Sequence, residues 1–199
     1  MPLFTFAAGS IGPWRITSAT AVRGEGLAYA THLAVIEGDA PVSDAAWTLR
    51  GVTSNQRYTT RAEHDTLAAR PADLGRPDAT EAAFIPIRKT AAWWLLTQDE
   101  RRAIFEERAQ HIATSLPYTP AIARRLHHSR DLGEPFDFLT WFEFAPADAP
   151  AFDDLVARLR ASEEWQYVER EVEVRLTRDE LRSGALVSPD LRPPKTPLT

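Results

Sequence analysis

Residues 120–144 constrain the fold more than any other stretch, because they form two extended segments around the central loop DLGEP. The first segment, AIARRLHH, taken alone has good helical propensity, so a second helix is the alternative. The symmetry about the loop favours an antiparallel hairpin, which places Arg124 opposite Phe142 and Leu126 opposite Thr140 on one face. An arginine on a buried, largely apolar face needs an anionic partner, because an unpaired buried charge is costly.

A helix is expected just before this hairpin. Residues 97–100, TQDE, form a capping box in which the threonine hydroxyl and the glutamate carboxylate satisfy each other's backbone N–H groups. His111 follows at helical spacing from Ile104 and lies next to Ile112, until Pro117 ends the helix. We therefore expect His111 to point at whatever the helix covers. A lone histidine on such a face is more often a hydrogen-bonded core residue, but a neutral imidazole is also a ligand for iron.

Two acidic residues follow a second predicted helix, which begins near residue 148 and has an apolar stripe. They are Glu163 and Glu164. Either carboxylate could accept a hydrogen bond from the second ring nitrogen of His111, which would raise its basicity and fix its tautomer. Residues 168–176 then alternate apolar and charged side chains, which predicts a strand with one solvated face.

The first half of the chain shows weaker patterns. Residues 13–22, 46–53 and 82–90 each predict a strand, and Pro86 should put the last of these at an edge or a bulge. Residues 61–70 predict a short amphipathic helix. The adjacent histidines on the hairpin, by contrast, fall on opposite faces, and no HExxH or Cys/His spacing supports a zinc site there.

These elements predict an α+β fold with antiparallel sheets. The order strand, helix, hairpin, helix, strand is that of a ferredoxin-like unit, and the first half looks like a shorter copy of it. We expect a shortened N-terminal domain over residues 1–95, a C-terminal domain over residues 96–182, and a disordered proline-rich tail over residues 183–199. A chain that is 44% apolar has enough hydrophobic residues for a sizeable core.

Composition excludes several classes of function. The net charge of −5, with 23 basic residues interleaved among 28 acidic ones, argues against nucleic acid as a partner. No run approaches the roughly 20 apolar residues that a membrane span requires, and the start lacks a signal-peptide pattern, so we expect a cytoplasmic protein. Cysteine is absent and the one methionine is the initiator, which excludes disulfides. It also removes the most easily oxidised side chains, by chance or because the protein works near a strong oxidant.

Several long segments together resemble the chlorite dismutase family. They are GVTSNQRYTTRAE, IPIRKTAAWW, the helix that carries His111, ARRLHHSRDLGEPFDFLTWFEFAP and LRASEEWQYVEREVEVRL. The resemblance covers residues 10–180, and the short first domain is similar to the small, dimeric branch of that family. The family shares a structural superfamily with coproheme decarboxylases and dye-decolourising peroxidases.

The resemblance implies one haem b per chain, bound in the second domain, and conversion of chlorite to chloride and dioxygen with O–O bond formation at the iron. By position, His111 matches the axial iron ligand, and Arg124 matches the catalytic distal arginine that holds the oxyanion. Glu164 best matches the hydrogen-bonding partner of His111, with Glu163 as the alternative. Residues that match neighbours of the haem edge, the propionates or the distal wall are Asn55, Tyr58, Ile87, Lys89, Trp93, Leu126, Thr140 and Phe142.

Two other functions are compatible with the same fold. Relatives that decarboxylate coproheme resemble this chain less and often lack the distal arginine, so Arg124 favours chlorite. A non-catalytic haem carrier or sensor ranks third, since a pocket with a buried cation is costly for storage alone. We expect chlorite as the small-molecule partner, no membrane, and a homodimer.

Overall fold

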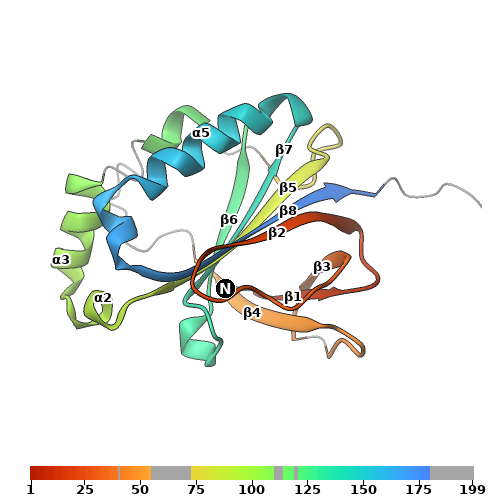
Figure 1. Cartoon of the computed structure of the whole chain (residues 1–199), viewed down its shortest axis with the longest axis horizontal. Helices are drawn as coiled ribbons and strands as arrows, with labels where there is room; N and C mark the ends of the chain where they lie inside the picture. Colours follow the sequence, from red (N-terminus) through yellow and green to blue (C-terminus); the bar gives the residue numbers. More distant parts are fainter. Residues whose placement is uncertain (40, 55–72, 110–113, 119–120, 180–199) are drawn as a thin grey trace, which may run out of the picture.

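The computed structural model describes residues 1–39, 41–54, 73–109, 114–118 and 121–179. Its eight strands pair antiparallel and close into one barrel in the order β1-β3-β2-β8-β5-β7-β6-β4 (Figure 1). The strands are β1 (Leu3–Gly9), β2 (Trp14–Arg23), β3 (His32–Glu37), β4 (Trp47–Thr53), β5 (Glu81–Lys89), β6 (Ala123–His128), β7 (Phe138–Phe144) and β8 (Val168–Arg178).

Each half of the chain contributes four neighbouring strands to the barrel in the same relative order. The first half runs β4-β1-β3-β2 and the second half runs β8-β5-β7-β6, so the first strand of each set lies between the fourth and the third. The α+β class with antiparallel pairing is confirmed. The halves do not form separate sheets, because β2 pairs with β8 and β4 pairs with β6. Closing the barrel in this way pairs strand edges that two open sheets would expose.

The helices lie mainly outside the strands of the second half. Figure 1 shows α5 (Ala149–Arg160) lying across these strands, with α2 (Ala91–Leu95) and α3 (Gln98–Arg102) nearby at one end of the sheet. The remaining turns are the π-helix η1 (Ala103–Arg108) and the 3-10 helices η2 (Leu116–Tyr118), η3 (Arg130–Leu132), η4 (Pro146–Asp148) and η5 (Glu163–Tyr167). Among the described residues, no helix is long and apolar enough to cross a membrane.

Two apolar cores result, one on each face of the second-half strands. The barrel interior includes Phe6 and Phe84, whose rings stack at 4.5 Å between centroids. The other core lies between the outer face of the sheet and α5, where Phe152 packs against both Phe142 and Phe144. Helix α5 therefore covers part of the outer face of the second-half strands.

This cover makes one prediction about β8 wrong. Its alternation predicted a strand with one solvated face, and Val172, Val174 and Leu176 do point into the barrel core. On the opposite face Glu169 is exposed as predicted, but Glu171 and Glu173 bond Arg160 of α5, and Glu171 is 0% exposed. The pattern of alternation identified the strand but not what covers its charged side.

The capping box before α3 is confirmed: the Thr97 side chain accepts from the Glu100 N–H, and the Glu100 carboxylate accepts from the Thr97 N–H. The helix does not continue as a regular α-helix, because residues 103–108 form a π-helix. A π-helix has more residues per turn, so the predicted shared face of Ile104 and His111 does not follow from α-helical spacing. Ile104 itself is buried.

Proline lies in an unexpected place within β5. Pro86 predicted an edge strand or a bulge, but β5 lies between β7 and β8. Its pairing with β8 lacks partners at Ile85 and Pro86, whereas its pairing with β7 is continuous there. The missing proline N–H is accommodated by an interrupted ladder on one side. The predicted helix over residues 61–70 and the tail over residues 183–199 lie outside the described residues.

Candidate active site

The hairpin of β6 and β7 has the register that the sequence predicted. Arg124 pairs with Phe142 and Leu126 pairs with Thr140, and β5 extends the second row because Ile85 pairs with Thr140. Directly opposed residues in antiparallel strands share a face. The predicted wall residues therefore lie together on the outer face of the sheet, beneath the helices.

Arg124 places a positive charge on this largely apolar face. Burial lowers the pKa of its guanidinium, and no carboxylate acts against that shift. Within the part of the chain that the structure describes, Arg124 forms no side-chain ion pair or hydrogen bond. Arginine remains protonated even so, and a partly buried cation without a counter-ion is costly. Such a side chain suits an anion that arrives from outside the chain.

The next residues of β6 point the other way. Arg125 lies 4.8 Å from the centre of the Phe4 ring, and His127 packs edge-on against Phe4 and Phe6 in the barrel core. His127 Nδ1 lies 3.1 Å from the Leu139 carbonyl oxygen, while Nε2 has no hydrogen-bond partner among the described residues. Burial lowers the pKa of His127 to about 4, so this imidazole is neutral at pH 7. The described residues contain no cluster of three or more His, Cys, Asp or Glu that could hold a metal ion.

Lys89 and Glu164 form a buried ion pair. The Lys89 Nζ atom lies 2.6 Å from Glu164 Oε1, and the two side chains are only 3% and 6% exposed. The backbone N–H of Lys89 donates to Asp137 Oδ2 at 2.7 Å. The resemblance had matched Lys89 to the haem edge and Glu164 to the axial histidine, and the structure brings these two residues together although they are 75 positions apart in the sequence. A pair so deeply buried holds both groups in one geometry.

The two acidic candidates next to each other have different surroundings. Glu164 faces inward toward Lys89. Glu163 is 35% exposed and pairs at 3.0 Å with Arg108, which is itself 53% exposed. The geometry therefore favours Glu164 as the carboxylate on the interior side.

Trp93 supplies a buried donor at the same end of the sheet. Its side chain is 1% exposed, and its ring centre lies 4.6 Å from Lys89 Nζ. Its indole N–H finds no acceptor among the described residues. Buried indole N–H groups normally have a partner, so this donor is available for an acceptor from outside the chain. Ile87 lies on β5 two positions before Lys89 and is also buried.

Three of the predicted site residues, Asn55, Tyr58 and His111, lie outside the described residues. One residue that supports the site was not predicted from the sequence. Asp137 is buried and accepts from the Lys89 backbone and, at 3.3 Å, from the Trp94 indole N–H. Burial raises the pKa of Asp137, against these hydrogen bonds. An aspartate just after a hairpin loop is so common that no sequence signal could have singled it out.

Comparison with known proteins places this geometry in a family. The family model described as chlorite dismutase matches residues 37–179, which is most of the chain. The chain belongs to the chlorite dismutase family. A crystal structure of a dimeric chlorite dismutase from Nitrobacter winogradskyi is 58% identical, covers 88% of this chain and 99% of that one, and has a TM-score of 0.83.

More distant members agree in fold. The chlorite dismutase of Candidatus Nitrospira defluvii in complex with imidazole is 18% identical, covers 88% of this chain and 91% of that one, and has a TM-score of 0.62. A curated chlorite dismutase from Ideonella dechloratans is 37% identical over 91 residues, which is 45% of this chain. The match spans only 30% of that relative's length.

Chlorite dismutases depend on haem, and the described residues fit such a group in two respects. The orphaned indole N–H of Trp93 offers a donor for a carboxylate at the edge of a macrocycle. Arg124, which has no ion-pair partner among the described residues, lies on β6, two strands away from β5, the strand that precedes the helix of Trp93. A planar apolar group with acidic substituents has complementary chemistry to both.

Proposed function

We propose that this chain is a haem b enzyme that converts chlorite to chloride and dioxygen. Membership of the chlorite dismutase family supports the reaction class. The observation that carries the proposal is Arg124, a partly buried guanidinium with no counter-ion among the described residues. A small oxyanion would supply the missing negative charge, and the planar fork of arginine can bind two of its oxygens at once.

The role of Arg124 follows from its position. Its guanidinium would bind chlorite, orient it, and keep an anionic fragment from leaving before the O–O bond forms. The apolar residues beside it, Leu126 and Phe142, would exclude water and other reductants. The absence of internal methionine and of cysteine fits a protein exposed to leaked oxidant.

One haem b per chain would supply the redox-active iron at which chlorite binds. We propose His111 as its axial ligand and Glu164, already paired with Lys89, as the carboxylate that hydrogen-bonds the other ring nitrogen of His111. The residues proposed to contact the haem edge, propionates or distal space are Asn55, Tyr58, Ile87, Lys89, Trp93, Leu126, Thr140 and Phe142. Lys89 would act on the site through Glu164, because its ammonium points toward that carboxylate.

The test is oxygen release from haem-loaded protein after addition of chlorite, followed with a Clark electrode. We expect close to one dioxygen per chlorite from the unmodified chain. Arg124→Ala should retain haem but lower kcat/KM by about 100-fold, because a charge that stabilises the reacting anion is lost. Arg125→Ala is the matched control, since its side chain lies over Phe4 on the barrel side, and it should retain the activity.

Three results would contradict the proposal. Equal activity in Arg124→Ala and the unmodified chain would remove the role of Arg124. Full haem loading with a normal spectrum in His111→Ala would reject the axial ligand. Well-loaded protein that releases no oxygen would reject chlorite as substrate, and assays with coproheme and peroxide would then separate a decarboxylase from a haem carrier.

We also propose the assembly and the subdivision of the fold. A homodimer is supported by the dimeric relative that is 58% identical over nearly its whole length. Two ferredoxin-like domains are supported by the shared strand order of the two halves, with helices concentrated in the second. We also propose that the protein is cytoplasmic.

A further inference from the structure

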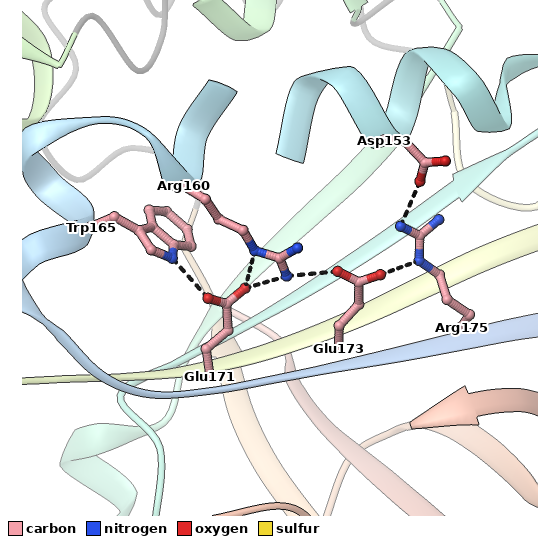
Figure 2. A network of polar contacts seen from close by, with 6 residues as sticks. All are labelled: Asp153, Arg160, Trp165, Glu171, Glu173 and Arg175. Atoms are coloured by element: carbon pink, nitrogen blue, oxygen red, sulfur yellow. Dashed lines mark hydrogen bonds and ion pairs between the residues drawn. The ribbon is translucent and has the colours of Figure 1, made fainter. Parts of the chain in front are cut away.

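The charged face of β8 forms a chain of ion pairs with α5 (Figure 2). Asp153 bonds Arg175 at 2.7 Å, Arg175 bonds Glu173 at 2.5 Å, and Glu173 bonds Arg160 at 2.6 Å. Arg160 Nε then donates to Glu171 Oε1 at 2.8 Å. Carboxylates and guanidiniums alternate along this chain, so each arginine is shared by two acids.

Glu171 is the buried end of this series of ion pairs, and it also contacts Trp165. Its Oε2 accepts a 2.8 Å hydrogen bond from the indole N–H of Trp165, while its Oε1 is held by Arg160. Figure 2 shows the Trp165 ring and the Arg160 fork approaching the same carboxylate from different sides. With 0% exposure, Glu171 has no access to water, so these two donors satisfy it.

Trp165 connects this chain to the buried pair of the active site. It follows Glu164 in η5, and its ring centre lies 5.6 Å from Lys89 Nζ, the atom that binds Glu164. The Trp165 carbonyl also accepts from Arg23 Nη1 at 3.0 Å. The residue is thus fixed at its indole and at its backbone, and its ring faces the Lys89 ammonium.

We propose that Glu171, held by Arg160, is a positioning residue for the Lys89–Glu164 pair and acts through the Trp165 indole. Its consequence for the iron rests on the proposed function, in which Glu164 supports the axial histidine. Stability alone gives little reason for such an arrangement, because a buried ion pair is often no better than well-packed apolar residues. A carboxylate that fixes the rotation of one indole supplies a defined geometry that apolar contacts leave looser.

Lys89 and Lys195 are the two lysines of the protein. The reactivity of Lys89 can therefore be measured against that of Lys195 in the absence of haem. Acylation of the apo protein with acetic anhydride, followed by peptide mass spectrometry, gives the rate at Lys89 relative to Lys195. Glu171→Leu should raise this relative rate roughly fivefold, because a loosened Trp165 exposes the ammonium more often. Trp165→Phe, which removes the N–H but retains a ring, should do the same, and the double variant should add little.

Two variants serve as controls. Glu173→Leu also removes one carboxylate from the series of ion pairs and leaves Arg160 and Arg175 with one carboxylate each. Glu173 bonds these two arginines, whereas the Trp165 indole bonds Glu171. Glu171→Gln retains an oxygen acceptor for the indole. Both should raise the relative rate less than about twofold. Equal rates in Glu171→Leu and Glu173→Leu would overturn the proposal, and if Glu171→Leu does not fold, an unchanged rate in Trp165→Phe would do so.

The haem-loaded protein gives a second readout. The reduction potential of the iron should shift in Glu171→Leu in the same direction as in Glu164→Gln, and should not shift in Glu173→Leu. Altered labelling with an unchanged potential would reject the link to the iron. If the unmodified chain binds no haem, the proposed function fails, and the labelling of the apo protein still decides the positioning role.

Discussion

Arg124 and Arg160 have opposite electrostatic surroundings. Arg124, on β6, has no ion-pair partner among the described residues, and burial lowers its pKa. Arg160, at the end of α5, binds Glu171 and Glu173, and these carboxylates raise its pKa although burial opposes them. Both are arginines placed between a sheet and the helices that cover it.

The difference indicates what each charge is for. Arg160 is neutralised by the fold itself, so its charge is part of the architecture that joins α5 to β8. The fold leaves Arg124 without a carboxylate in the described residues, so its charge is available to a ligand. A partly buried cation without a carboxylate partner among the described residues is therefore a better guide to the site than the burial of a cation alone.

Removing each charge in turn should separate the two roles in the free energy of unfolding of the apo protein. Arg160→Met should lose about 3 kcal/mol, because Glu171 would remain buried without its cation. Arg124→Met should lose nothing or gain stability, because it removes a partly buried charge that has no ion-pair partner among the described residues. Urea unfolding at pH 7 measures both values.

Glu173→Leu is the control for this pair, since it shortens the ion chain and leaves Glu171 bonded to Arg160. A loss in Arg124→Met as large as that in Arg160→Met would mean that the fold also depends on Arg124. The contrast between a ligand-binding charge and an architectural one would then be wrong.

Local periodicity was enough to predict the central hairpin. The alternation around DLGEP fixed both the strands and their register, so Arg124, Leu126, Thr140 and Phe142 could be placed on one face. The capping box before α3 is equally local and was also found. Such features depend on residues close in sequence, and side-chain direction follows directly from strand geometry.

The rest depended on contacts between distant segments. The charged side of β8 was predicted to be solvated, because nothing in the sequence of β8 shows that Arg160 covers Glu171. Lys89 and Glu164 carry no local pattern that predicts their pairing. The strand over residues 3–9 was missed because LFTFAAG is a short apolar run without alternation, buried along most of its length.

His127 lies on the other face of β6, and its neutral imidazole packs in the barrel core. Its pKa is lowered from 6.5 to about 4, first by burial and further by Arg125 and His128, against the Leu139 carbonyl. The unfolded chain binds the proton more readily, so stability is complete above pH 6.5 and falls as the pH drops toward 4. Between pH 7 and pH 5 this group should cost about 2 kcal/mol of unfolding free energy.

Urea unfolding of His127→Leu at the two pH values measures this contribution. The variant should lose about 2 kcal/mol of the difference between pH 7 and pH 5. Val174→Ala, a cavity variant on the same side of the sheet, should keep the full difference at lower overall stability. An unchanged difference in His127→Leu would assign the acid sensitivity to other groups.

The smallest effect is expected on the outer side of α5, two residues before Arg160. Arg158 bonds Asp154 at 2.9 Å, but their side chains are 60% and 50% exposed. Water already solvates both charges, so the pair adds little once side-chain ordering is counted. Arg158→Ala should therefore leave the unfolding free energy unchanged within experimental error, and it should leave the labelling rate of Lys89 unchanged too. A loss comparable to that of Arg160→Met would show that α5 is held by its exposed charges as much as by its buried ones, and burial would no longer explain why Arg160 matters.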